Sequence, residues 1–295
     1  MNEFEAGGFS ETTTASFSAD AIIGAIGTDN ATASEATTFD YQYGIGLNTS
    51  FTGEDSFDVT IDVGGAAAAS QSAIGGLAGF DANAGVLTVD GITYSFPVGS
   101  ATMLVGDATD ISGVYSGACA YGGFADYMGN CGTGNSVGVG GAGVTAAMSY
   151  AFDGGFTIAG GVSSPQSEIL GESDDIYGLE VAYSDDVYGV AVAYSDAEAA
   201  SYVGLNAFYD FDFATLSAGY ESADVDAEAD TTSTFFVGMT KEVGPGTFEL
   251  GYGSSDVTAT LGLNLTETAY IYDASYAVSY THLRAHETGR NLVCR

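Results

Sequence analysis

The chain has very few basic residues. Its 295 residues include 39 Asp and Glu but only four Lys and Arg, which gives a formal net charge of -35. Nucleic-acid binding depends on basic side chains that neutralise phosphates, so this balance excludes a nucleic-acid partner. A chain with this charge attracts cations and repels anions. Hydrophobic residues still make up 46% of the sequence, too many for a disordered acidic chain.

Long apolar runs and proline are also scarce. No stretch approaches the roughly 18 continuous apolar residues of a membrane-spanning helix. Proline, which removes a donor from a β-ladder, occurs three times, whereas glycine occurs 43 times, and this composition fits long, fully paired strands. Residues 1–4 have neither the basic n-region nor the apolar h-region of a signal peptide. We therefore expect that a signal peptide was removed or that the chain is a fragment.

The few basic residues are concentrated near the C-terminal end. Between Met1 and Ser279 there is no Arg and no His, whereas the stretch that follows contains every Arg and His of the chain. This stretch also resembles adaptor sequence that is read through at the ends of unrelated environmental translations. We interpret residues 280–295 as a non-native read-through tail and leave them out of the fold argument.

A period-2 alternation is the main positive signal in the sequence. In residues 177–194, Tyr, Leu and Val alternate with Gly, Ala and acidic residues, and Tyr stands at both ends of each segment. A soluble β-sandwich also alternates, but it buries its large side chains in a core. Aromatic residues at both rims with aliphatic residues between them are typical of strands that cross a bilayer. The pattern predicts a transmembrane β-barrel.

The connections between the alternating segments support an antiparallel, up-and-down order. Short turns and long acidic loops alternate strictly along the chain, as in outer-membrane barrels. Asp90-Gly91 could form a hairpin turn, but it would put two short connections in a row, so we predict one strand over 86–98. About 14 strands are visible, and an even total of about 16 would close the barrel. The predicted strands are 12–26, 38–52, 56–64, 86–98, 101–107, 136–150, 155–163, 175–184, 186–195, 200–210, 213–222, 231–241, 246–254 and 266–277.

Three stretches carry a resemblance to a known family. They are residues 9–14, 38–55 and 94–99, and the strand and turn Leu47-Asn48-Thr49-Ser50-Phe51-Thr52-Gly53 is the most specific of them. From about Phe9 to Val278 the chain resembles the porin domain of cyanobacterial outer-membrane porins, relatives of the carbohydrate-selective porins. The resemblance implies an incomplete barrel domain over 1–279 in the outer membrane of a Gram-negative-type, cyanobacterial cell. It also implies contact with outer-membrane lipids and passive diffusion of ions or sugars, and a homotrimer, because trimers are common among such porins.

The third long loop, over 107–136, is expected to have a special role. The resemblance implies that it folds inward and narrows the channel, with Asp107, Asp110 and Asp126 on this constriction loop. It also contains Cys119 and Cys131. A disulfide between them would stabilise the loop by roughly 3 kcal/mol and suits an oxidising exterior; the alternative is two free thiols.

Several acidic residues share the small-residue parity of their strands, which places them toward the interior. A charge on the lipid face of a barrel is costly, so we expect these carboxylates to line the pore. They would then favour cations, as acidic rings do in cation channels, or they would simply keep a wide lumen wet. The predicted pore-lining residues are Asp58, Asp62, Glu180, Glu249 and Asp273.

The sequence offers no catalytic arrangement, and we expect no enzyme, cofactor or metal. No His precedes residue 280, and the glycine-rich stretch 138–143 runs into a strand rather than a phosphate-binding helix. The acidic segment 224–230 lacks a calcium-loop motif and fits a solvated loop. The sequence therefore predicts a cation-preferring porin for small hydrophilic solutes. The alternative is a secreted, soluble, acidic β-protein, such as a surface-layer or adhesive module, whose large side chains would pack into a core.

Overall fold

The computed structural model describes residues 13–24, 36–65, 79–81, 83–122, 130–137, 143–165, 175–226, 232–255 and 269–277. Within these ranges the protein is all-β apart from short helical turns, which are η1 (Ile111–Val114), α2 (Gly134–Val137) and a 3-10 turn at residues 130–132. None of them is long and apolar enough to cross a membrane, and the same holds for every helix in the described part of the chain.

Fourteen strands form a single antiparallel sheet in which each strand pairs with its neighbours in sequence. They are β1 (Thr13–Gly24), β2 (Thr38–Thr49), β3 (Ser56–Gly64), β4 (Thr88–Val98), β5 (Ala101–Thr109), β6 (Gly143–Ala151), β7 (Phe156–Ser164), β8 (Ile176–Ser184), β9 (Tyr188–Asp196), β10 (Ala200–Asp210), β11 (Thr215–Val225), β12 (Thr232–Val243), β13 (Gly246–Ser255) and β14 (Ala269–Ala277).

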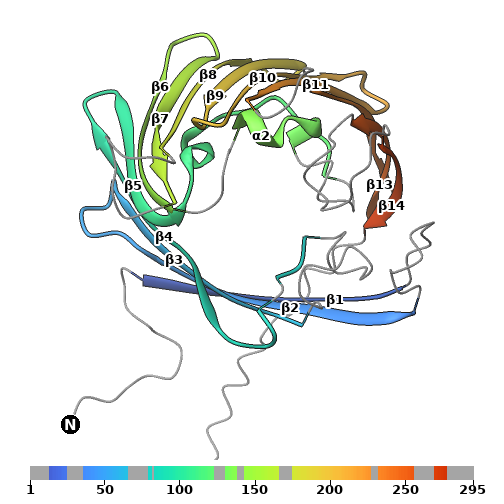
Figure 1. Ribbon diagram of the computed structural model, residues 1–295, viewed down its shortest axis with the longest axis horizontal. Coiled ribbons are helices and arrows are strands. Elements are labelled where there is room, and N and C mark those ends of the chain that lie inside the picture. Colours follow the sequence, from blue (N-terminus) through green and yellow to red (C-terminus); the bar gives the residue numbers. More distant parts are fainter. Residues whose placement is uncertain are drawn as a thin grey trace, which may run out of the picture.

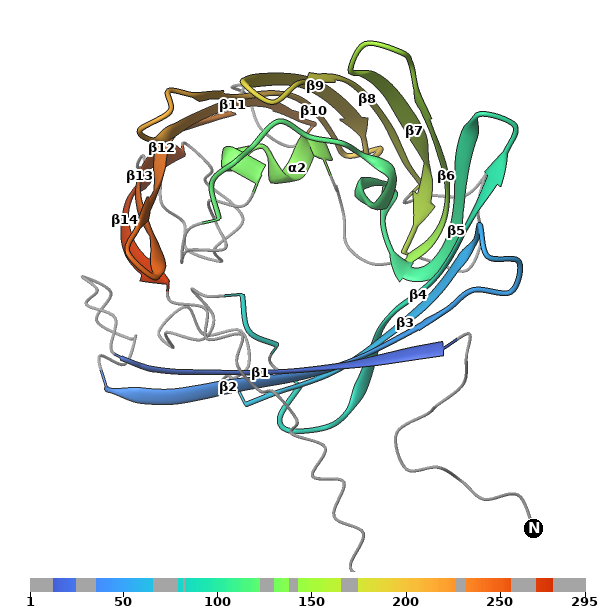
Figure 2. The ribbon, with the colours of Figure 1, turned by 180° about the vertical axis from the view of Figure 1, so that it is seen from behind.

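The sheet curls into the wall of an up-and-down barrel. Figures 1 and 2 show the strands arranged around a common interior, with β1 and β2 across from β8–β11. Among the described strands, β1 and β14 are the two ends of the sheet. β1–β14 thus form a barrel wall that is not closed in the described part of the chain, since β1 and β14 do not pair with each other.

The burial pattern is the reverse of that in a soluble sheet. On β9 the large side chains Val190 and Val192 are 40% and 48% exposed, whereas the small Ala191 between them is 1% exposed. Large residues therefore face outward and small residues face the interior. The soluble alternative required the large side chains to pack into a core, and the structure shows the opposite. An outward apolar face is the arrangement that a bilayer stabilises.

Aromatic side chains form a belt around the end of the barrel that carries the short turns. Neighbouring rings in this belt lie 4.5 to 6.1 Å apart between centroids, in tilted, stacked or edge contacts. Aromatic girdles of this kind mark the membrane interface of transmembrane barrels. The belt consists of Phe51, Phe57, Tyr94, Phe96, Tyr150, Phe152, Phe156, Tyr183, Tyr188, Tyr209, Phe211 and Phe213.

The structure confirms the fourteen predicted strands, and the largest differences lie beside the third long loop. Asp90 and Gly91 lie inside β4, as predicted, at a register shift opposite Thr60 and Ile61. β5 continues to Thr109 rather than ending at residue 107, and β6 begins at Gly143 rather than at 136. Part of the segment that was predicted as the start of β6 forms the helical turn α2, because the chain there follows the inner wall instead of joining the sheet.

Candidate functional site: an inward loop on the barrel wall

The described residues between β5 and β6 lie inside the barrel. Figures 1 and 2 show this segment and its α2 turn on the interior side of β8–β11. It begins at Asp110, whose carboxylate accepts a hydrogen bond from the Ser112 N–H at 2.8 Å and caps η1. Ile111 and Val114 of η1 then pack with Leu104, Ala147 and Ile176 in a buried apolar cluster against the wall. We call the described residues 110–122 and 130–137 the inner loop.

The outgoing arm of the inner loop, residues 110–122, is held by polar side chains that project from β8, β10, β11 and β13. Ser116, Ala118, Ala120 and Gly122 each donate a backbone N–H to the wall. The acceptors are Glu180 Oε1 on β8 at 2.7 Å, Asn206 Oδ1 on β10 at 2.8 Å, Ser217 Oγ on β11 at 3.1 Å and Glu249 Oε1 on β13 at 3.0 Å. Every second residue from 116 to 122 is therefore fixed to the wall.

The spacing of these contacts follows from strand geometry. If fully extended, residues 116–122 would cover at most about 20 Å, at about 3.3 Å per residue, and Gly117 with its φ of 59° shortens this length. The steps from β8 to β13 cover about 24 Å, at about 4.8 Å per neighbouring strand. The loop lies on the concave side of the wall, where the arc is shorter. An extended segment can therefore reach an acceptor from the wall at alternate residues.

The returning arm uses a second set of contacts. The Ser136 N–H donates to Glu221 Oε2 at 2.6 Å, and the Asn135 side chain donates to Glu221 Oε1 at 2.9 Å. Asn206 bridges both arms, because its amide nitrogen donates to Thr133 Oγ1 at 3.0 Å. Carboxylates that accept such bonds form stronger hydrogen bonds than neutral acceptors do.

Apolar contacts and a disulfide complete the attachment. Cys119 and Cys131 are joined by a disulfide that links the two arms, with their Cα atoms 5.7 Å apart. Cys131 packs with Phe236 and Tyr121, whose ring centroids are 4.8 Å apart. Phe236 lies on the small-residue parity of β12, where a large side chain breaks the alternation. The structure explains this exception, because the ring is fully buried under the inner loop.

Glycines on the inner face give the loop its close approach. A Cβ atom at Gly219 of β11 would overlap the carbonyl oxygen of Cys131, and one at Gly204 of β10 would overlap Ser136 Oγ. Neither position can carry a larger residue without moving the loop. The high glycine content of this wall therefore has a packing reason beyond the width of the barrel.

The opposite wall carries acidic residues with different partners. Asp58 on β3 accepts hydrogen bonds from Asn48 Nδ2 and Ser56 Oγ, each at 2.6 Å. Asp20 on β1 is exposed and lies opposite Gln42 of β2. The Asp58 carboxylate is thus bound by side chains of its own wall, whereas Glu180 and Glu249 are bound by backbone amides of the inner loop.

Three carboxylates gather near the long-loop end of β3 and β4. Oxygen atoms of Asp62, Asp81 and Asp90 all lie within 4.8 Å of one another. Asp62 is buried and Asp90 is exposed. Burial and the nearby Asp90 charge both raise the pKa of Asp81, which lies in the connection between the strands. Such clusters also occur without an ion, so the geometry alone assigns no metal.

The structure places the predicted site residues in different surroundings. Asp58 and Asp62 lie on the interior parity of β3, where Asp58 is half-buried and Asp62 is 7% exposed. Glu180 and Glu249 are on the interior parity of their strands and lie under the inner loop, with 1% and 8% exposure. Asp107 was predicted on the constriction loop, but it lies within β5, which continues to Thr109. It is opposite the outward-facing Ile92 and therefore lies on the outer face of the strand. Asp273 of β14 lies opposite Gly251 of β13, and Asp126 lies outside the described residues.

Three of the residues that hold the loop are not among those predicted from the sequence. Asn206, Ser217 and Glu221 are all buried, and all three occupy the small-residue parity of their strands. A polar side chain on the small-residue parity of a strand was the sign in the sequence that something inside the barrel binds there. No local pattern in sequence identifies a partner about 90 residues away, so this sign alone could not show what these side chains hold.

Comparison with protein families gives one match. A family model described as "Gram-negative porin" matches residues 91–285, which is more than half of the chain. No curated protein sequence matches the chain.

Several solved structures share the fold. An anion-selective porin from Comamonas acidovorans has a TM-score of 0.58 at 15% identity, over 92% of this chain and 85% of that chain. Salmonella typhi OmpF, in a complex with daunomycin, has a TM-score of 0.56 at 12% identity, over 90% of this chain and 86% of that chain. A mutant of the Rh. blastica porin has a TM-score of 0.54 at 15% identity, over 89% and 90% of the two chains. At these identities the likeness establishes the fold.

Proposed function

The chain belongs to the Gram-negative porin family, and from this premise we propose that it passes small hydrophilic solutes by passive diffusion and prefers cations. Its place is the outer membrane, where the outward apolar face contacts lipid. The solutes that suit a wet, polar interior are inorganic ions and sugars. The inner loop narrows the path from the side of β8–β13.

The observation that carries the cation preference is the charge of the wall that faces the inner loop. Asp20, Asp58 and Asp62 lie on the interior parity of β1 and β3. In the described part of the chain the one basic residue is Lys241, which alternates with the loop-contacting Thr240 and so takes the outward parity of β12. Fixed negative charge without a basic counterpart raises the local concentration of cations and excludes anions.

Closure of the barrel is a further part of the proposal. β1 and β14 each have one neighbour among the described strands, and open strand edges are unfavourable in lipid because their backbone groups lack partners. We propose that about two further strands close the barrel, for an even total near sixteen.

The resemblance to cyanobacterial porins supports two finer proposals, a homotrimeric assembly and an origin in such a cell. The assembly is tested by the intact mass of the protein extracted in a mild detergent. A mass of three chains is the expected result, and a mass of one chain contradicts it.

The decisive experiment is the reversal potential of single channels in a planar bilayer under a salt gradient. We expect stepwise conductance with a cation-selective reversal potential. The double variant Asp20→Asn/Asp58→Asn should move that potential toward zero, because it removes two interior charges that the inner loop does not cover and keeps similar side-chain volumes. Glu180→Gln/Glu249→Gln is the matched control, since it removes two charges that lie under the loop. Conductance without ion preference would refute the cation proposal, and folded protein that never conducts would refute the channel.

A further inference from the structure

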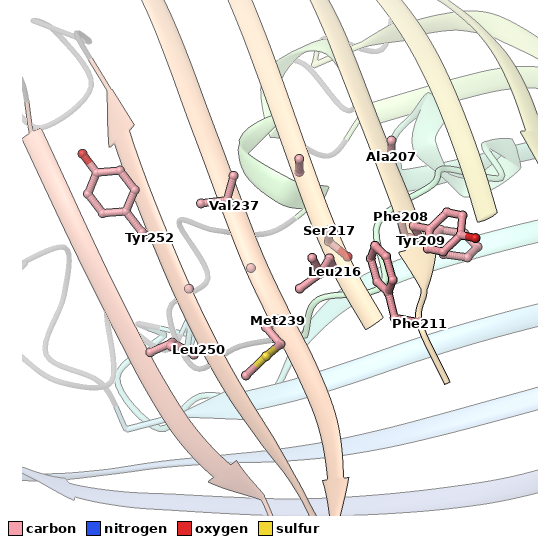
Figure 3. Close-up of a pocket in the computed structure, with 13 residues that line it drawn as sticks. Ala207, Phe208, Tyr209, Phe211, Leu216, Ser217, Val237, Met239, Leu250 and Tyr252 are labelled. Carbon is pink, nitrogen blue, oxygen red and sulfur yellow. The ribbon is translucent and has the colours of Figure 1, made fainter. Parts of the chain in front are cut away.

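The outer face of the barrel has a groove over β10–β13. Its volume is about 720 Å³, and it lies on the face where the large side chains are exposed (Figure 3). No charged side chain lines it. We call this hollow the outer groove; its main lining residues are Ala207, Tyr209, Leu216, Ala218, Val237 and Leu250.

The groove follows from the cross-strand register. Ala207 on β10 lies directly opposite Ala218 on β11. The outward pair on one side of these alanines is Leu205 with Tyr220, and the pair on the other side is Tyr209 with Leu216. Two small residues between two pairs of large ones leave a depression in the face. In a bilayer such an apolar depression is filled by an apolar group that fits its shape.

One end of the outer groove is acidic. A second hollow shares Tyr209 and Phe211 with the groove, and it is also lined by Asp186, Asp210 and Asp212. These carboxylates lie in and next to two of the short turns, beside the aromatic belt. The exposed Lys241 is two residues beyond Met239 of the groove on β12, toward the same end of the barrel. An apolar slot therefore ends at negative groups with a positive group nearby.

We propose that the outer groove binds one glycerophospholipid with an ammonium headgroup. An acyl chain fills the slot over Ala207 and Ala218, because it gains contact with apolar surface that a flat face does not offer. The ammonium group lies at Asp186, Asp210 and Asp212, and the lipid phosphate lies toward Lys241. Each charged part of the headgroup then meets a group of opposite sign at the membrane interface.

The charge of the protein argues against a second copy of the chain in this place. With 39 acidic residues and four basic ones, another copy would bring mainly negative or neutral surface to the carboxylates. Like charges brought together at an interface are unfavourable. A zwitterionic lipid supplies the missing positive group as well as the apolar chain.

The test measures retained lipid by native mass spectrometry. The full chain is folded in mixed micelles that contain equal amounts of phosphatidylethanolamine and phosphatidylglycerol with the same acyl chains, and it is then exchanged into lipid-free detergent. We expect the protein to keep one phosphatidylethanolamine, with a preference of about fivefold over phosphatidylglycerol, from weak, partly exposed ion pairs.

Two variants separate the two parts of the site. Ala218→Phe fills the slot and should abolish retention, whereas Ala146→Phe, on the outer face of β6 away from the groove, should retain lipid like the wild type. Asp186→Asn/Asp210→Asn/Asp212→Asn leaves the slot intact and should retain both lipids equally. Heat-modifiable migration on a gel checks that each variant is folded.

Three results would overturn the proposal. The first is equal retention of the two lipids by the wild type, and the second is undiminished retention by Ala218→Phe. The third is a loss of oligomer mass in Ala218→Phe without any retained lipid in the wild type, because the occupant would then be a second copy of the chain. None of these results depends on conductance, so the lipid site and the channel can fail separately.

Discussion

The two inner walls of this barrel carry the same kind of side chain and use it in different ways. On β8–β13 the carboxylates of Glu180, Glu221 and Glu249 accept hydrogen bonds from the inner loop and are buried beneath it. On β1–β4 the carboxylates of Asp20 and Asp58 have no such cover, and Asp58 is bound by side chains of its own wall. A carboxylate on the interior parity can therefore hold the loop or charge the path, and its hydrogen-bond partner decides between these roles.

The first test of the difference between the two walls is to remove the disulfide that links the two arms of the inner loop. Cys119→Ala/Cys131→Ala should cost about 3 kcal/mol of local stability, because the disulfide no longer restricts the opened loop. Amide hydrogen exchange of residues 116–122 should then become about a hundredfold faster. The same peptides of the wild type in a dithiol reductant should respond alike, and peptides from β1–β4 serve as the internal reference. Equal protection in both proteins would mean that the wall contacts alone hold the loop.

The second test is to push the loop away from its wall. Gly219→Ala places a Cβ atom against the Cys131 carbonyl, and the resulting overpacking should cost about 1–3 kcal/mol. The single-channel conductance should fall, because the displaced loop moves into the path.

Gly91→Ala is the matched control for this variant. It lies on the opposite wall, and the nearest atom to its Cβ would be the Ala108 carbonyl oxygen at 3.5 Å. This substitution should be neutral or stabilise the fold by about 0.4–1 kcal/mol through the unfolded state. A loss of conductance in both variants would show that any added methyl on the inner face has this effect.

The third test separates the charge of a loop-holding carboxylate from its hydrogen bonds. Glu180→Ala leaves the Ser116 and Gly117 N–H groups without their acceptor, at a cost of about 1–3 kcal/mol. Glu180→Gln keeps an acceptor oxygen and should cost less. Hydrogen exchange at residues 116–118 should follow that order. If Glu180→Gln shifted the reversal potential as much as Asp58→Asn does, the distinction between the two walls would be wrong.

The sequence was sufficient for the sheet but not for the roles of the interior residues. Alternation placed Val190 outward and Ala191 inward, because a bilayer and a wet interior impose a period of two on every strand. The same rule put Glu180, Asp58 and Phe236 on one face. It could not show that Glu180 and Phe236 are covered by residues far away in sequence, since such contacts depend on the path of the inner loop. Exceptions to the alternation, such as Phe236, were the best local sign of that cover.

The smallest expected effect lies at the short turn between β2 and β3, outside the membrane and away from the loop. Burial tends to raise the pKa of Asp55, but hydrogen bonds from the Thr52 N–H, the Ser50 and Thr52 hydroxyls and the Tyr94 hydroxyl outweigh it. The pKa of Asp55 therefore lies well below its usual range.

This shift predicts how the turn responds to acid. A group whose pKa is lowered by folding stabilises the protein fully above its unfolded pKa, about 3.9 for Asp, and loses that contribution as the pH falls through the folded value. Asp55→Ala should therefore lower the urea midpoint in detergent at pH 7, and the gap to the wild type should narrow only below about pH 4. If the gap instead stayed constant into strong acid, the ionised carboxylate would not be what holds the turn, and its contacts with Ser50 and Tyr94 would act as neutral hydrogen bonds.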